Sequence, residues 1–501
     1  MNRLYGWQYN PLYHSGVIAA ALFAIVTVTG LYLLLFYRIG APFESVEHIT
    51  NQIWLGQWSR SLHRYASDGA ILFAVIHAVR MLVQRRSWGP RTLAWISGLF
   101  LFGIIFLCGW TGYVMVWDIQ GEVLAREGAR WMDALPLFSE PIGRAFDGER
   151  PLPGAFFFLN LFAHVALPIG VGLGLWIHVA RVARPVLVPP KRLAWGITLV
   201  LSAASALLPV TMAPPADVFR HAGRAPYDVF FAFFLPVTMP LPPWAVWVLG
   251  LFVTALICAV PWLTRPGAEA LLPPSTVDER SCTGCEQCYL DCPYEAIAMV
   301  PRSDGRPYLL AQVDPDLCTS CGICAGSCAP MGVGPAGRTG KDMLRAAKQF
   351  HAAHAYGGDV VLVACERGAG AANPDGFAGS PVFAVSCAGN LHSSAVEYFV
   401  RSGAAGVLVV SCPPRDCWNR EGGTWLEERL YHDREAELQP RVDKRRVRVV
   451  FAGEAERGAL RAALAAFRRD LAALGPAAAE AAPDVGTECE APVSAMIGDG
   501  R

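Results

Sequence analysis

The chain has 501 residues, of which 53% are hydrophobic and only 17% are charged. Basic and acidic residues number 42 each, so the formal net charge is zero, which gives no support to a nucleic-acid partner. The length is typical of about three domains. Long apolar runs fill the first half, whereas the second half has the composition of a water-soluble protein.

The first half predicts a transmembrane helical domain over residues 1–263. No cleavable signal peptide is recognised, because the N-terminal stretch is polar and aromatic. Residues 228–240 are too short and proline-rich to span, which predicts an interfacial or re-entrant segment. The positive-inside rule places the arginine-rich loops after the second and fourth spans in the cytoplasm. Six segments are apolar and long enough to span a lipid bilayer, namely residues 15–37, 65–83, 93–116, 154–180, 193–211 and 242–263.

Four histidines recur at one spacing. His63 and His77 lie fourteen residues apart on the second span, and His164 and His178 repeat this on the fourth. Fourteen residues make nearly four helical turns, so each pair shares a face and is separated by about 21 Å. A buried imidazole needs a partner; a lone one is commonly a satisfied core group. Matched pairs on two spans running in the same direction predict two bis-histidine haems, His63 with His164 and His77 with His178.

Glycines and arginines accompany the histidines. A flat macrocycle inside a helix bundle needs neighbours that lack side chains. Glycines occur fourteen residues apart on two other spans, namely Gly16 and Gly30 on the first and Gly98 and Gly112 on the third. Arg60 and Arg80 each lie three residues from a histidine, which makes them candidates to pair with haem propionates.

The stretches RSLHRYASDGAILFAVIHAVR, GWTGYVMVWD and HVALP resemble the cytochrome b of quinol-oxidising bc-type complexes, with the photosynthetic branch nearer. The resemblance covers about residues 5–195 and continues weakly to about 262. It implies haem b, quinone or quinol as partner, lipid as surroundings and a possible homodimer. The family's Pro-Glu-Trp-Tyr motif reads Pro-Tyr-Asp-Val here, so Asp228 is the candidate acid of a quinone site. The missing glutamate argues against bifurcating quinol oxidation.

Two cysteine motifs, CTGCEQCYLDCP and CTSCGICAGSCAP, follow a proline-rich linker at residues 264–277. Both read C-x2-C-x2-C-x3-C, the bacterial ferredoxin signature for two [4Fe–4S] clusters, in which the fourth cysteine ligates the other cluster. Structural zinc, the alternative, usually shows paired C-x2-C knuckles. We therefore expect a ferredoxin-like α+β domain over residues 278–335. Its expected ligand sets are Cys282, Cys285, Cys288 with Cys328, and Cys318, Cys321, Cys324 with Cys292.

The runs DVVLVAC, VFAVSC and GVLVVSC predict buried parallel strands of an α/β domain over residues 357–470. Its four cysteines lie mostly at strand ends, where such sheets place ligand loops; they are Cys365, Cys387, Cys412 and Cys417. Free core cysteines are the alternative. The stretch SCAGNLHSSAVEYFVRSGAAGVLVVSCPPRDCWNREGG resembles the delta subunit of methyl-viologen-reducing hydrogenase. That resemblance implies a [2Fe–2S] cluster that relays electrons to heterodisulfide-reductase-type flavoproteins, although only Cys365 stands where the family has C-x-x-C.

Two other stretches carry no site. The loop GVGPAGRTGKD has the wrong spacing for a phosphate loop, with Asp342 where serine or threonine is needed. Residues 471–501 are rich in alanine, proline and glycine and are expected to be disordered.

Together these features predict a multi-pass oxidoreductase of the inner membrane with its iron–sulfur domains in the cytoplasm. It would pass electrons between the quinone pool and a cytoplasmic flavoprotein, dehydrogenase or heterodisulfide-reductase-like subunit. Any flavin or nicotinamide chemistry belongs to that partner, because no glycine-rich dinucleotide fingerprint appears. Two alternatives remain: a redox-active membrane anchor without its own quinone turnover, and a bc-type quinol oxidase subunit working with a separate Rieske protein.

Overall fold

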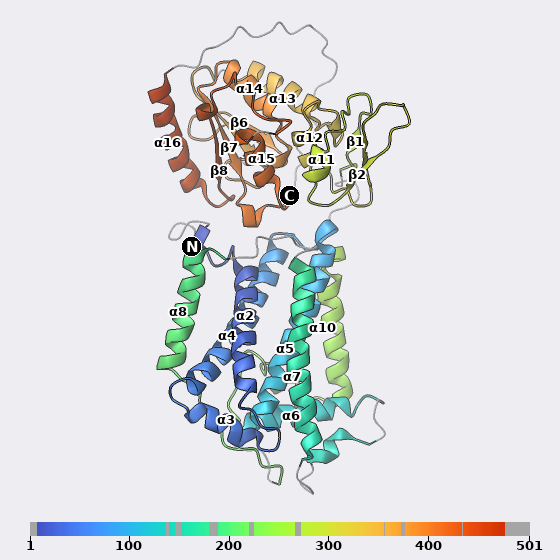
Figure 1. Cartoon of the computed structure of the whole chain (residues 1–501), viewed down its shortest axis with the longest axis vertical. Helices are drawn as coiled ribbons and strands as arrows, with labels where there is room; N and C mark the ends of the chain where they lie inside the picture. Colours follow the sequence, from blue (N-terminus) through green and yellow to red (C-terminus); the bar gives the residue numbers. More distant parts are fainter. Residues whose placement is uncertain are drawn as a thin grey trace. The chain divides into compact units, whose positions relative to one another are not determined.

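The computed structural model (Figure 1) divides the chain into two compact units, Met1–Leu272 and Pro273–Arg501, which we describe separately. The residues that it describes are 8–136, 140–146, 152–179, 189–219, 225–265, 272–354, 356–371, 376–432 and 434–475.

Apolar helices dominate the first unit. Among the described residues, five are long and apolar enough to cross a membrane: α2 (Ser15–Leu34), α4 (Gly56–Val83), α5 (Thr92–Val116), α7 (Gly154–Ile177) and α10 (Pro243–Leu263). The sixth expected span, residues 193–211, forms α8 (Lys191–Leu207). Its 17 residues reach only about 25 Å, less than the hydrocarbon core. Five spans are therefore supported, and the sixth stays a prediction.

The helices that carry the histidine and glycine repeats pack in pairs, α2 against α4 and α5 against α7. Shorter helices connect them: α3 (Pro42–Asn51), α6 (Ile119–Met132) and α9 (Leu235–Thr238). The Asp118 carboxylate begins α6 by accepting the Gly121 N–H at 3.0 Å. Residues 228–240 form turns and the single turn of α9, and Phe234, directly before α9, stacks on Trp110.

The second unit begins with two small antiparallel sheets. In one, β1 (Thr276–Val277) pairs with β4 (Val333–Gly334), and in the other β2 (Ile297–Val300) pairs with β3 (Leu310–Val313). The short helices α11 (Gln287–Leu290) and α12 (Ile323–Ser327) each begin just before a motif cysteine. The linker expected to run to residue 277 therefore ends earlier, because Val277 already packs in the core of these sheets. Residues 266–271 of that linker lie outside the described residues.

A four-stranded parallel sheet, ordered β6-β5-β7-β8, forms the rest of the second unit. Its strands are β5 (Val360–Cys365), β6 (Val382–Val385), β7 (Gly406–Ser411) and β8 (Val447–Phe451). Alternate strand residues face opposite sides, so both faces are apolar and need cover. The helices α13 (Gly340–Ala353), α14 (Ser393–Arg401) and α15 (Gly422–Tyr431) cover one face. The other is covered by α16 (Arg457–Leu474), which Figure 1 shows in red.

Two expected boundaries of this α/β domain are wrong. Helix α13 precedes residue 357, but its Met343 and Ala347 belong to the same core as the sheet. The rejected phosphate loop begins this helix instead, with Thr339 and Asp342 forming a capping box. At the other end, Leu471 packs in the core on the far face, so α16 passes residue 470. The remainder of the expected disordered tail, residues 476–501, lies outside the described residues.

Candidate redox centres

His63 and His164 face each other across the helix bundle. Their ring centroids lie 6.3 Å apart, edge to face. Two metal–nitrogen bonds of about 2 Å each, plus the two ring radii, require a separation of this size. The pair therefore fits a bis-histidine haem iron.

Hydroxyl groups fix which nitrogen each of these rings can offer. His63 Nδ1 lies 3.0 Å from Thr29 Oγ1, and His164 Nδ1 lies 3.1 Å from Thr111 Oγ1. Each hydroxyl donates its own proton to carbonyls one turn back in its helix, so it must accept from the imidazole. Nδ1 carries the proton, and the Nε2 lone pair is left for a metal.

At the second level, formed by His77 and His178, only His178 has a hydroxyl partner of the same kind in the part of the chain that the structure describes. His178 Nδ1 lies 2.8 Å from Ser97 Oγ, which donates to the Leu93 carbonyl at 2.7 Å. His77 lies within electrostatic range of His178. Its Nδ1 is buried and has no hydrogen-bond partner among the described residues. The same is true of Ser15 Oγ.

The four glycines contact the imidazoles themselves, not only the space expected for a macrocycle. A Cβ added at Gly112 would lie 2.9 Å from His164 Cε1, and one at Gly16 would lie 2.9 Å from His77 Cε1. The corresponding distances are 3.1 Å for Gly30 to His63 and 3.5 Å for Gly98 to His178. The rings of His77, His63 and His164 thus pack in recesses that a side chain would fill, whereas a Cβ at Gly98 would make only an ordinary contact with His178.

The expected propionate partners have other contacts. Arg60 donates to the Val210 carbonyl at 2.8 Å, and Arg80 donates to the Tyr13 carbonyl at 3.1 Å and lies over the Tyr13 ring. Their role towards propionates stays a prediction.

Both oxygens of Asp228 are engaged. Oδ2 accepts from Tyr113 at 2.6 Å and pairs with Arg64, while Oδ1 accepts backbone N–H groups of the turn that follows. An acid that exchanges a proton with a quinol must present an oxygen to it. Asp228 would have to break one of these contacts to do so. In this structure its carboxylate pairs with Arg64 and holds the following turn.

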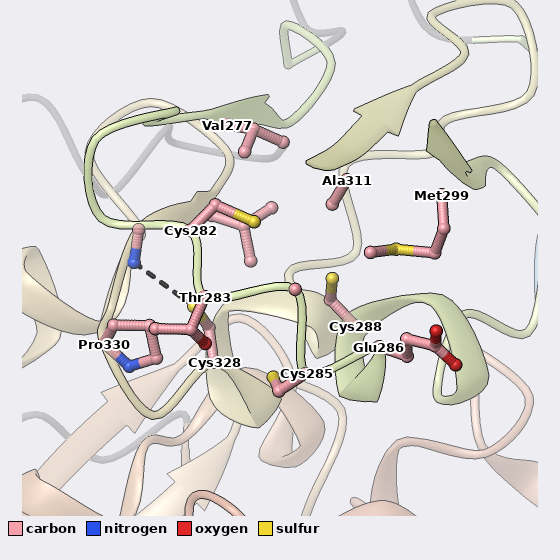
Figure 2. A pocket seen from close by; sticks show the side chains of 13 residues that line it. Val277, Cys282, Thr283, Cys285, Glu286, Cys288, Met299, Ala311, Cys328 and Pro330 are labelled. Carbon is pink, nitrogen blue, oxygen red and sulfur yellow. Dashed lines mark hydrogen bonds between the residues drawn. The ribbon is translucent and has the colours of Figure 1, made fainter. Parts of the chain in front are cut away.

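The eight ferredoxin-motif cysteines line two cavities in the second unit. The first has Cys282, Cys285, Cys288 and Cys328 on its wall (Figure 2). The second is lined by Cys292, Cys318, Cys321 and Cys324. The fourth cysteine of each motif thus crosses to the cavity of the other, which is the grouping expected from the spacing.

The walls of these cavities disfavour free thiolates. Burial raises the pKa of Cys324 to about 12, and burial also raises the pKa of Cys328. A bound cationic cluster would reverse that penalty, because it deprotonates the thiol that coordinates it. Backbone N–H groups already point at sulfur, as Gly332 does towards Cys328 Sγ at 3.2 Å, the dashed line in Figure 2. The donor set and the apolar walls fit iron–sulfur clusters.

The four cysteines of the α/β domain converge at the carboxyl ends of the strands. Each is at most 4% exposed; they are Cys365, Cys387, Cys412 and Cys417. A Cβ added at Gly422 would lie 2.7 Å from Cys387 Sγ and 3.6 Å from Cys417 Sγ, so these two sulfurs meet beside the start of α15. The pKa of Cys417 is lowered, first by the neighbouring thiols of Cys387 and Cys412 and then by the N–H groups that begin α15. Four buried thiols that interact electrostatically are candidate donors for a further cluster.

Comparison with known families gives these centres their context. The family described as cytochrome b/b6/petB matches residues 4–186. The 4Fe-4S dicluster domain matches residues 281–332, and the delta subunit of methyl-viologen-reducing hydrogenase matches residues 362–475. The chain carries a cytochrome b-like domain, followed by a 4Fe-4S dicluster domain and a domain similar to that delta subunit. The dicluster match decides against zinc at the two cysteine motifs, and the fusion described by the sequence is confirmed.

Relatives of the cytochrome b domain include cytochrome b subunits of menaquinol:cytochrome c reductase and cytochrome b6 proteins. The cytochrome b subunit of menaquinol:cytochrome c reductase from Geobacillus thermodenitrificans is 27% identical over 32% of this chain and 79% of its own length. Cytochrome b6 of Desmonostoc is 33% identical over 26% of this chain and 60% of its own length. A solved chain of a hyperthermophilic respiratory complex III matches 52% of this chain and 78% of its own length, at 18% identity and a TM-score of 0.41. The fusion is a multi-pass membrane protein with an electron-transfer role as a subunit of a complex.

Sequence reasoning missed the hydroxyl residues of the cytochrome b domain. Each of the four glycines follows a serine or threonine, in the dipeptides Ser15-Gly16, Thr29-Gly30, Ser97-Gly98 and Thr111-Gly112. The glycine receives the ring, and in three cases the hydroxyl binds its Nδ1. A search one position before each glycine would have found this signal.

Proposed function

We propose that the fusion passes electrons between the quinone pool and a cytoplasmic redox protein, through two b haems, two [4Fe–4S] clusters and one cluster of the [2Fe–2S] type. The observation that carries this proposal is the His63–His164 pair, with Nδ1 bonded to hydroxyls and Nε2 left for iron. The named activity of the relatives, menaquinol:cytochrome c reductase, supports a quinol as the lipid-soluble substrate.

Bound haems and clusters supply reversible one-electron transfer. The protein contributes the rest. The serine and threonine hydroxyls hold the imidazole tautomer, the glycines admit the rings, and the helix bundle keeps water from the iron. In the dicluster domain, apolar walls and N–H groups that point at the cysteine sulfurs would tune the reduction potentials of the bound clusters.

The types of centre favour electron flow from the soluble partner towards the quinone. Ferredoxin-type clusters have low potentials, so electrons fall readily from the soluble partner through the clusters to the haems and the quinone. The positive-inside rule, together with the sixth predicted span, supports a cytoplasmic location of the iron–sulfur domains, where such a partner is available. A flavoprotein or heterodisulfide-reductase-like subunit fits the family of the last domain.

The test uses the purified full chain, reduced anaerobically and mixed with a water-soluble menaquinone analogue. We expect the haem absorbance to re-oxidise, and the His77→Ala variant to lose one of two haems by pyridine hemochromogen analysis. A chain that holds haem but is not re-oxidised by the analogue is a redox-active anchor instead. A chain that holds no haem overturns the proposal altogether.

A further inference from the structure

The dicluster domain and the α/β domain meet along a tightly packed seam within the second unit. Helix α12, which carries Cys324, packs against the short helix η5 (Ala388–Asn390), which directly follows Cys387. A Cβ added at Gly326 would lie only 2.4 Å from the Gly389 carbonyl oxygen. The backbone segments that carry a cysteine of the second cavity and a cysteine of the four-sulfur site are therefore in direct contact.

Arg338 crosses this seam. One terminal nitrogen donates to Ser386 Oγ at 3.0 Å and the other to the Ser320 carbonyl at 2.7 Å. Ser386 precedes Cys387, and Ser320 precedes Cys321. The guanidinium thus connects the residue before a cysteine of the four-sulfur site with the residue before a cysteine of the second cavity. Its Nε is buried and has no partner among the described residues.

Arg429 is a second buried cation in the seam, only 1% exposed. It donates to Ser327 Oγ at 2.8 Å and to the Gly389 carbonyl at 2.6 Å, and Asp291 Oδ2 lies 3.9 Å away. Ser327 itself donates to that carboxylate at 2.6 Å, and Arg434 also pairs with it. A charge buried this completely is kept only where its partners hold it in place.

Cysteines of both sites are among the groups whose charges act on the two arginines. Burial lowers the pKa of Arg338, while Cys321 and Cys324 on one side and Cys387 on the other oppose that shift. Burial likewise lowers the pKa of Arg429 to about 10, against the charges of Asp291, Cys387 and Cys324. Arg338 therefore lies between the second cavity and the four-sulfur site, because it bonds to the residues before Cys321 and Cys387. Arg429 also contacts Ser327, the residue before Cys328 of the first cavity.

We propose that this seam is the electron-transfer junction between the second [4Fe–4S] site and the four-cysteine site, with Arg338 and Arg429 as positioning residues. In the step, one reduced centre loses one electron and its neighbour gains it, with no bond made or broken. A fixed positive charge stabilises the more negative, reduced form of a nearby centre. Both arginines therefore raise the reduction potentials of the two flanking centres. The inference rests on the proposed function, since it requires a cluster at each site.

The test is an EPR-monitored redox titration of the full chain with Arg338→Gln, Arg338→Lys and a surface control, Arg345→Gln, on the exposed side of α13. At fixed ambient potential, Arg338→Gln is expected to lower the reduced-to-oxidised ratio of the two flanking centres about tenfold, or about 59 mV. The first cubane should not move. Arg338→Lys should restore most of the shift, and Arg345→Gln should match the wild type.

A second measurement covers the case in which Arg338→Gln does not assemble. In the wild-type chain, reduction of the neighbouring cubane should broaden the EPR signal of the four-cysteine centre through magnetic coupling. Loss of that centre by Cys412→Ser should remove the broadening. The junction is overturned if the midpoint potentials of the two flanking centres do not change in Arg338→Gln. It is also overturned if the wild-type EPR spectrum shows no magnetic coupling. Neither result contradicts the proposed function. A wild-type chain without iron at the four cysteines overturns the proposed function instead.

Discussion

Substituting Gly112 by alanine is the most direct test of the haem site. The added Cβ would lie 2.9 Å from His164 Cε1. Carbon atoms normally approach to about 3.5–4.0 Å, so the ring must withdraw by roughly 0.6–1.1 Å. That movement stretches the bond from His164 Nδ1 to the Cys108 carbonyl, now 2.9 Å, beyond hydrogen-bond range.

The expected cost has two parts. Overpacking costs about 1–3 kcal/mol, and a lost hydrogen bond about 0.5–1.5 kcal/mol. Together they give about 1.5–4.5 kcal/mol, or about 10- to 2000-fold weaker haem retention at this level.

Two other glycines on the same helix provide a graded control. At Gly98 the added Cβ would make an ordinary contact at 3.5 Å with His178, and at Gly103 it would meet nothing within 4 Å. Gly103→Ala should therefore be neutral or stabilising, because alanine favours the helix by about 1 kcal/mol. Haem per chain, measured by pyridine hemochromogen, should fall in Gly112→Ala and hold in the other two. Equal haem content in all three variants would refute the geometry.

Three further variants test separate parts of the chain. His63→Ala and His164→Ala should remove the same spectral component, and the double variant should lose nothing more; two distinct losses would separate the pair. Cys292→Ser should abolish the EPR signal of the second cubane and Cys328→Ser that of the first, whereas the reverse assignment would contradict the crossed cavities. Thr339→Ala removes the capping box of α13 and should lower the thermal stability of the full chain by about 1 kcal/mol, measured against the exposed Lys341→Ala.

Local spacing explains what the sequence could predict. Cluster size sets the spacing of the C-x2-C motifs, and helical pitch sets the fourteen-residue histidine repeat. Both are spacings within one segment, so they can be recognised in the sequence. Contacts between distant segments produce no such local spacing pattern. Arg429 binds Ser327 and Gly389, which lie 102 and 40 residues away in the sequence. No motif near Arg429 therefore predicts its role. The two-residue strand β1 was missed because a proline-rich stretch gives no strand periodicity.

The serine or threonine that precedes each glycine leads to the last prediction. At three of the four histidines a hydroxyl accepts from Nδ1, but at the fourth, Ser15 Oγ and His77 Nδ1 are both buried and lack a partner among the described residues. Two unsatisfied buried groups cost about 1–3 kcal/mol each, and a hydrogen bond between them would remove both costs. Because Gly16 already contacts the His77 ring, we expect Ser15 to bind this imidazole in the haem-loaded protein.

Ser15→Ala should then weaken the Nδ1 hydrogen bond, make His77 a poorer donor to iron and raise the midpoint potential of that haem. Ser97→Ala acts on His178 at the same level and should shift the same haem in the same direction in a redox-poised optical titration. A shift in Ser97→Ala with none in Ser15→Ala would mean that His77 takes its partner from another part of the chain. In the Ser15-Gly16 dipeptide, only the glycine would then contribute to the haem site.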